Sequence, residues 1–193
     1  MDMRSAILKK NFESIYAHGF QATRTDKVIL SLGITKGAFY HYFPDKYSMG
    51  YAIVEEIIYP MFVGNWENAY KQHENSVEAL LSAVQHIQNI ATVENIGLGC
   101  PLNNLIQEMS TIDEAFRVKL AYIIEAELVL ITRILEEGIA KKQIKASIHT
   151  ENTACFILAG IEGSFALGKA KNSLPTFQAS MQVLTDFLQN LKV

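Results

Sequence analysis

A turn glycine, a helix cap and a proline stop follow one another between Leu32 and Lys46. Gly33 can adopt the positive φ that a chain needs after a helix. Thr35 is a favourable N-cap, because its hydroxyl can accept a hydrogen bond from a free amide one turn later. Pro44 cannot continue a helix. The stretch therefore predicts the end of one short helix, a tight turn and a second short helix.

The second of these helices is predicted to have two different faces. Helical spacing places on its apolar face Ile34, Ala38, Phe39, Tyr42 and Phe43. The opposite face carries Lys36, Gly37, Tyr40 and His41. It offers ammonium, aromatic and imidazole groups and is too short and polar for a core. This arrangement is typical of a helix that reads the DNA major groove. The alternative is the ordinary solvent face of a helical hairpin.

The charge of the chain is unevenly distributed. Its net charge is −3, which argues against a nucleic-acid partner. Residues 1–50, however, carry seven basic and four acidic side chains, and the remainder has a net charge of −6. A basic end on an acidic body is the charge footprint of a DNA-binding head on a body that does not bind DNA.

The rest of the chain favours helices throughout. Apolar spacing and caps predict helices over residues 2–18, 23–32, 46–59, 77–91, 102–109, 112–141, 150–171 and 175–191. Pro60 and Gly64 are expected to interrupt the helix that leaves the head. No strand pattern or repeat is present. We expect an all-α fold, with a helix-turn-helix DNA-binding domain over 1–50 and a larger helical ligand-binding and dimerisation domain over 51–193.

Helix caps add detail to these boundaries. Thr23 with Asp26, and Thr111 with Glu114, resemble capping boxes. Asp45 and Asn75 are predicted N-caps of the helices that follow them.

The compartment and the chemistry follow from what the sequence lacks. Two cysteines, Cys100 and Cys155, form neither a CxxC pair nor a disulfide framework, and no signal peptide or apolar run of about 18 residues is evident. We therefore expect a soluble, cytoplasmic protein. Motifs for nucleotide binding, nucleophilic catalysis and metal ligation are absent, so no enzyme activity, catalytic residue, metal or cofactor is expected.

The N-terminal residues resemble the TetR/AcrR family of transcriptional regulators. The resemblance rests on Arg4-x-x-Ile7-Leu8, Gly19-Phe20-x-x-Thr23, Asp26-x-Val28 and the run from Gly33 to Phe43 followed by Lys46. The segment from Gly99 to Ser110, together with Glu162-Gly163, is similar to the effector domains of one branch of that family. Asn11, Ile29 and Leu32 depart from the family pattern only in packing positions.

The resemblance implies a repressor that binds a pseudo-palindromic operator as a homodimer and is released by a small-molecule effector. Its implied DNA-binding residues are Arg24, Thr25, Thr35, Lys36, Gly37, Tyr40, His41 and Lys46. Arg24 and Thr25 begin the second helix, whose N-terminal amides can bind a backbone phosphate, and Lys46 can meet another. An activator would share all of these residues.

The effector site is harder to predict. Candidate lining residues are Met61, Phe62, Trp66, Cys100, Asn104, Met109, Phe116, Tyr122, Glu125 and Phe156, with Gln107 and Glu127 as further polar markers. Such aromatic and methionine residues are more often plain core. Cys100 begins a short helix, which lowers a thiol pKa and would suit a redox or electrophile sensor. Its alternative role is that of a small buried hydrophobe. Cys155 is predicted to lie in the core.

Assembly and the competing function complete the predictions. The helices 112–141 and 150–171 are too apolar to be covered by one chain, which predicts a two-fold interface forming a four-helix bundle. The alternative function is a helical small-molecule-binding protein or enzyme with a basic N-terminal end. Binding to DNA discriminates between the two.

Overall fold

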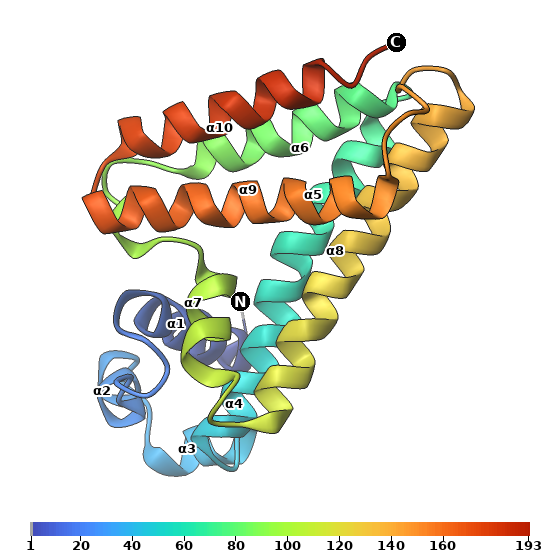
Figure 1. The fold of residues 1–193 in the computed structure, drawn as a ribbon. Coiled ribbons are helices and arrows are strands. Elements are labelled where there is room, and N and C mark those ends of the chain that lie inside the picture. Colours follow the sequence, from blue (N-terminus) through green and yellow to red (C-terminus); the bar gives the residue numbers. More distant parts are fainter. Residues whose placement is uncertain (1) are drawn as a thin grey trace. The chain divides into compact units, whose positions relative to one another are not determined.

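The computed structural model describes residues 2–193, and within them it contains helices and no strands (Figure 1). The elements in chain order are α1 (Met3–His18), α2 (Thr25–Ser31), α3 (Lys36–Tyr42), α4 (Lys46–Ile53), the π-helical turn η1 (Val54–Ile58), α5 (Tyr59–Gln72), α6 (Ser76–Ile90), the 3₁₀ turn η2 (Ile96–Leu98), α7 (Pro101–Met109), α8 (Glu114–Ala140), α9 (Thr150–Lys171) and α10 (Leu174–Gln189). The prediction of an all-α fold is confirmed.

Three of the predicted caps form. The Thr35 hydroxyl accepts from the Ala38 amide at 3.1 Å, and the Asp45 carboxylate accepts from the Ser48 amide at 2.6 Å. Asn75 caps α6 in the same way. Gly33 has φ +65°, as the turn before α3 requires.

The two predicted capping boxes are wrong. The Thr23 hydroxyl donates to the Gly19 carbonyl at 2.8 Å, so it closes the end of α1 and leaves Arg24 at the N-cap of α2. At the start of α8 the carboxylate of Asp113, rather than Thr111, accepts from the Phe116 amide at 2.8 Å. An Asp next to the first helical residue is the better-placed acceptor.

The helix that leaves the head is interrupted before Pro60 rather than at it. A π-helical turn over Val54–Ile58 follows α4, and α5 then passes through Pro60 and Gly64. Pro60 has no amide hydrogen to donate to the Glu56 carbonyl, which removes one α-helical bond at this point. A single π turn accommodates the change in pairing.

The chain divides into two compact units. The first combines the residues up to Met61 with Pro101–Tyr122, and the second combines Phe62–Cys100 with Ile123–Val193. The buried apolar side chains of the first unit include Ile7, Leu8, Ile15, Phe20, Val28, Phe39, Phe43, Met49, Ile53, Leu105, Met109 and Phe116. A segment remote in sequence, 101–122, thus belongs to the same unit as the helix-turn-helix.

In the second unit α6, α9 and α10 lie side by side (Figure 1). Gly168 of α9 allows close packing against η2, because a Cβ added to it would lie 2.8 Å from Ile96 Cδ1. α9 is long and apolar enough to cross a membrane by length and composition, contrary to our expectation for the sequence. Its residues Ala154, Ile157 and Ile161 are buried in the core of this unit, and a core helix passes the same test.

Candidate nucleic-acid interface and effector site

One face of α3 anchors it to the first unit. Phe39 and Phe43 are buried, and Ile34 and Ala38 are half-buried. Tyr42 was expected on this apolar face, but 38% of its surface is exposed. At the last residue of a two-turn helix it lies beyond the neighbours that would cover it, and its ring packs edge-on against His41 instead.

The other face of α3 is open to solvent. Lys36, Gly37, Tyr40 and His41 are all exposed, as predicted. Among residues 2–193 no hydrogen bond or ion pair engages the Lys36 side chain. A Cβ added to Gly37 would have Thr35 Oγ1 at 3.8 Å as its nearest neighbour, so the fold does not require glycine there. These side chains leave a polar and aromatic surface of one helix available to a partner.

The predicted phosphate-binding residues lie in more varied surroundings. The exposed Arg24 guanidinium pairs with Asp26 at 2.6 Å, and Thr25 is half-buried at the start of α2. Lys46 Nζ donates to the Gln21 carbonyl at 3.0 Å, and burial lowers its pKa. Lys46 is therefore bound within its own unit as well as being near its surface.

Several effector candidates lie in the first unit. Phe116 is buried in an aromatic cluster with Phe20, Tyr47 and Tyr51, with ring centroids 4.7–6.3 Å from its own. Met109 is buried nearby in the same unit and Asn104 is half-buried. The remaining two candidates of this unit, Met61 and Tyr122, are exposed, and Tyr122 stacks on Tyr59. Phe116 therefore belongs to the core of the first unit.

Two candidates of the second unit contact glutamates: Trp66 contacts the buried Glu127, and Cys100 contacts the half-buried Glu162. Trp66 is fully buried, and its indole Nε1 donates to Glu127 at 2.9 Å. Only 4% of Glu127 is exposed, and burial raises the pKa of this carboxyl to about 7. The charge of Glu162 raises that pKa further, and the Trp66 hydrogen bond opposes the increase. Glu127 is thus near Glu162 in a largely apolar environment.

Cys100 contacts the second of these acids. Its buried Sγ donates to Glu162 Oε1 at 3.2 Å. A carboxylate acceptor favours the thiol over the thiolate. Trp66 and Cys100 are therefore brought together around Glu127 and Glu162. Glu162 was not among the predicted site residues, although Glu162-Gly163 is part of the resemblance to the family's effector domains.

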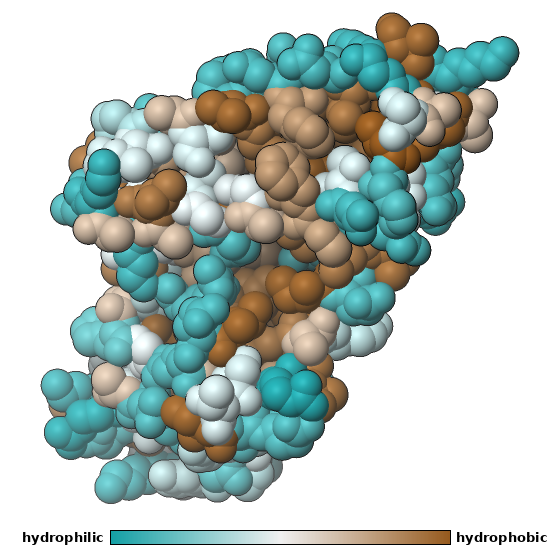
Figure 2. Space-filling view, viewed as in Figure 1, coloured by the Kyte–Doolittle hydropathy of each residue, from teal (hydrophilic) through white to brown (hydrophobic). Residues whose placement is uncertain are grey.

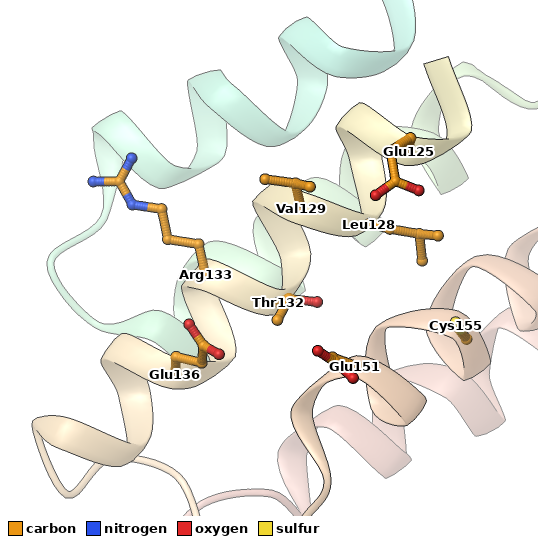
Figure 3. A pocket seen from close by; sticks show the side chains of 8 residues that line it. All are labelled: Glu125, Leu128, Val129, Thr132, Arg133, Glu136, Glu151 and Cys155. Atoms are coloured by element: carbon orange, nitrogen blue, oxygen red, sulfur yellow. The ribbon is translucent and has the colours of Figure 1, made fainter. Parts of the chain in front are cut away.

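The other candidates of the second unit do not join this cluster. Phe62 is half-buried, and Phe156 is 53% exposed with its ring against Phe187 at 5.0 Å. Glu125 lines a shallow groove of about 400 Å³ between α8 and the start of α9 (Figure 3). The groove is lined by Glu125, Leu128, Val129, Thr132, Arg133, Glu136, Glu151 and Cys155.

The position of Cys155 in this groove contradicts the prediction that it is core. Its neighbour Ala154 is fully buried, whereas Cys155 is exposed. Successive helical residues are turned by about 100°, and this turn takes the Cys155 side chain out of the sector of α9 that buries Ala154. Within residues 2–193, no group of three His, Cys, Asp or Glu side chains could hold a metal ion.

The comparisons with known proteins agree with this architecture. Residues 7–51 match the family model of bacterial regulatory proteins of the tetR family, and residues 76–184 match the tetracyclin repressor-like C-terminal domain. An uncharacterized HTH-type transcriptional regulator of Lactococcus lactis is 25% identical over 183 residues, or 94% of this chain and 90% of its own.

Solved structures resemble the whole chain in fold. The reduced form of NemR from E. coli has a TM-score of 0.84 at 21% identity, with 100% of this chain and 98% of the other covered. A TetR-family regulator from Agrobacterium tumefaciens has a TM-score of 0.86 at 18% identity, covering 98% and 97%.

The helix-turn-helix with its exposed α3 face, followed by a helical domain, defines a DNA-binding regulator of two-part construction. The chain belongs to the TetR family of transcriptional regulators, as its motifs predicted.

Proposed function

We propose that this protein is a repressor that binds a pseudo-palindromic operator as a homodimer and releases it when a small molecule binds in the second unit. The observation that carries the proposal is the solvent-exposed face of α3, with an ammonium, a phenol and an imidazole on one short helix held by Phe39 and Phe43. A helix of this kind fits the major groove.

The DNA contacts divide into two groups. Lys36, Tyr40 and His41 face base edges, with Gly37 allowing the backbone to approach the groove closely. Arg24, Thr25, Thr35 and Lys46 bind backbone phosphates and set the orientation of the head. Arg24 exchanges its exposed pair with Asp26 for a phosphate at little cost, because ion pairs between exposed side chains contribute little to stability.

The homodimer forms through the exposed face of α9 together with α10. Phe156, Leu167 and Val183 are more than half exposed there, and Figure 2 shows hydrophobic residues gathered over these helices. Gly163 lies on this face with open space above it. Two copies related by a two-fold axis would cover these side chains in a four-helix bundle. α8 also exposes Val118, Tyr122 and Val129, but α9 combines exposed apolar side chains with the open space at Gly163, and we therefore place the interface on α9 and α10.

The effector binds beside the polar cluster of Trp66, Cys100, Glu127 and Glu162. Buried carboxyls carry a desolvation cost, and a ligand with hydrogen-bond donors would compensate it. The Cys100 thiol is buried and donates to a carboxylate, so it is poorly suited to attack an electrophile. We therefore favour a non-covalent effector over a redox one. A protein that acts on operator DNA works in the cytoplasm and requires no enzymatic activity.

Selection of bound duplexes from a random-sequence DNA library tests the proposal. We expect enrichment of a sequence with two related half-sites whose centres are about one or two helical turns apart. Enrichment of no duplex, with tight binding of small molecules retained, would favour a helical small-molecule-binding protein instead.

A further inference from the structure

Glu108, near the end of α7, holds the backbone of the loop that joins α1 to α2. The amide of Phe20 donates to one carboxylate oxygen and the amide of Gln21 donates to the other, both at 2.8 Å. Hydrogen bonds to an ionised acceptor are about twice as strong as neutral ones. Gly19, with φ +85°, makes the contact possible, because a Cβ there would lie 3.0 Å from the nearer oxygen.

Lys46 holds the same loop from its carbonyl side. Its ammonium donates to the Gln21 carbonyl at 3.0 Å and lies 4.9 Å from the centre of the Phe20 ring. The charge of Glu108 raises the pKa of Lys46 and partly offsets the effect of burial. The two polar atoms of the Gln21 backbone are thus bound by side chains of opposite charge.

The side chain of Phe20 is also held in place, by aromatic packing. Its ring packs edge-on against Phe116 at 4.7 Å and Tyr47 at 5.3 Å. Gly50 leaves room for this packing, because a Cβ there would lie 2.5 Å from the Phe20 ring. The loop that precedes the helix-turn-helix is therefore bound to α7 and to the start of α8.

We propose that Glu108 is a positioning residue for operator binding. By fixing the loop over 19–22, it sets the position from which α2 and α3 meet DNA, although Glu108 itself is half-buried and contacts no operator group. The inference rests on the proposed function.

The test compares Glu108→Ala and Glu108→Gln with Gln107→Ala, an exposed neighbour on the same helix. The probe is the duplex that the wild-type protein enriches from a random library. We expect Glu108→Ala to weaken binding about tenfold or more, and Glu108→Gln to weaken it less, because a neutral amide still accepts one hydrogen bond. Gln107→Ala is expected to bind like the wild type.

The salt dependence separates positioning from direct contact. Glu108→Ala should leave the slope of log affinity against log salt unchanged, because no phosphate contact is lost. Arg24→Ala, which removes a proposed phosphate contact, should reduce that slope by about 0.9. Binding by Glu108→Ala within about twofold of wild type at equal folded fraction would overturn the proposal, as would a reduced slope.

Amide hydrogen exchange tests the contact without DNA. We expect the Phe20 and Gln21 amides to exchange faster in Glu108→Gln and Glu108→Ala than in Gln107→Ala, while amides in α9 stay unchanged. Unchanged exchange at both positions would overturn the proposal. If the wild type enriches no duplex, the proposed function fails. Faster exchange in the Glu108 variants would then show that Glu108 stabilises the loop over 19–22 without a role in DNA binding.

Discussion

The two units place their ionisable side chains in opposite ways. In the first unit the Lys36 and His41 side chains project from α3 into solvent and keep their hydration. In the second unit Glu127 is buried beside Trp66 and near Glu162, which costs folding free energy through desolvation. Outward groups suit a large, charged partner such as DNA, and buried ones suit a small ligand. The proposed function accordingly places DNA recognition in the first unit and small-molecule recognition in the second.

The largest expected effect is on stability, and it tests whether the segment 101–122 belongs to the first unit. Phe116→Ala removes the ring that packs against Phe20 and Tyr51, and we expect it to lower the free energy of unfolding by about 3–5 kcal/mol. Urea denaturation measures the change. Val118→Ala, two residues along and exposed, is the control and should cost less than about 1 kcal/mol. A loss below that value for Phe116→Ala would contradict the assignment.

Substitution of Gly163 tests the proposed two-fold interface in the second unit. Because a single chain has open space at this position, Gly163→Lys should fold as before and yet lose the dimer. Sedimentation velocity at micromolar concentration should show a monomer. Gly64→Lys, at an equally open glycine of α5, should remain dimeric. A dimeric Gly163→Lys variant would remove α9 from the interface.

The buried carboxyl of Glu127 predicts a pH dependence of stability. Its folded pKa of about 7 lies above the usual glutamate pKa of 4.5, so the folded state holds the proton more tightly. This stabilisation is fully present below pH 4.5 and is lost as the pH rises through 7, by about 1–3 kcal/mol in total. Glu127→Gln should abolish that decline, and Glu125→Gln, exposed on the same helix, should not. Equal pH profiles for wild type and Glu127→Gln would refute the prediction.

The smallest effect on stability is expected at Gly37. Replacing a helical glycine that has open space with alanine should stabilise α3 by up to about 1 kcal/mol. The added methyl group faces the proposed groove, so operator affinity should fall while the thermal midpoint rises or stays equal. Calorimetry and fluorescence anisotropy measure the two quantities. Unchanged affinity would mean that Gly37 does not approach the DNA.

Much of the helix-turn-helix could be predicted from the sequence, except the start of α2 and the exposure of Tyr42. Its determinants are local: Gly33 supplies the positive φ, Thr35 caps α3 and Asp45 caps α4. Contacts between remote segments could not be predicted. Nothing in the spacing of Phe116 distinguishes an effector pocket from the aromatic core of the head, and nothing near Cys155 shows which face of α9 the chain covers. The pairing of Glu108 with the Phe20 and Gln21 amides also depends on tertiary structure.

The central claim is that the exposed face of α3 binds DNA. Anisotropy titration of the enriched duplex with wild type and with the Lys36→Ala/Tyr40→Ala double variant tests it most directly. Both side chains are exposed, so the variant should keep the wild-type thermal midpoint. We predict that it loses at least about a hundredfold in affinity, since each base contact is worth about 1–3 kcal/mol. Binding by the double variant with wild-type affinity would contradict the claim.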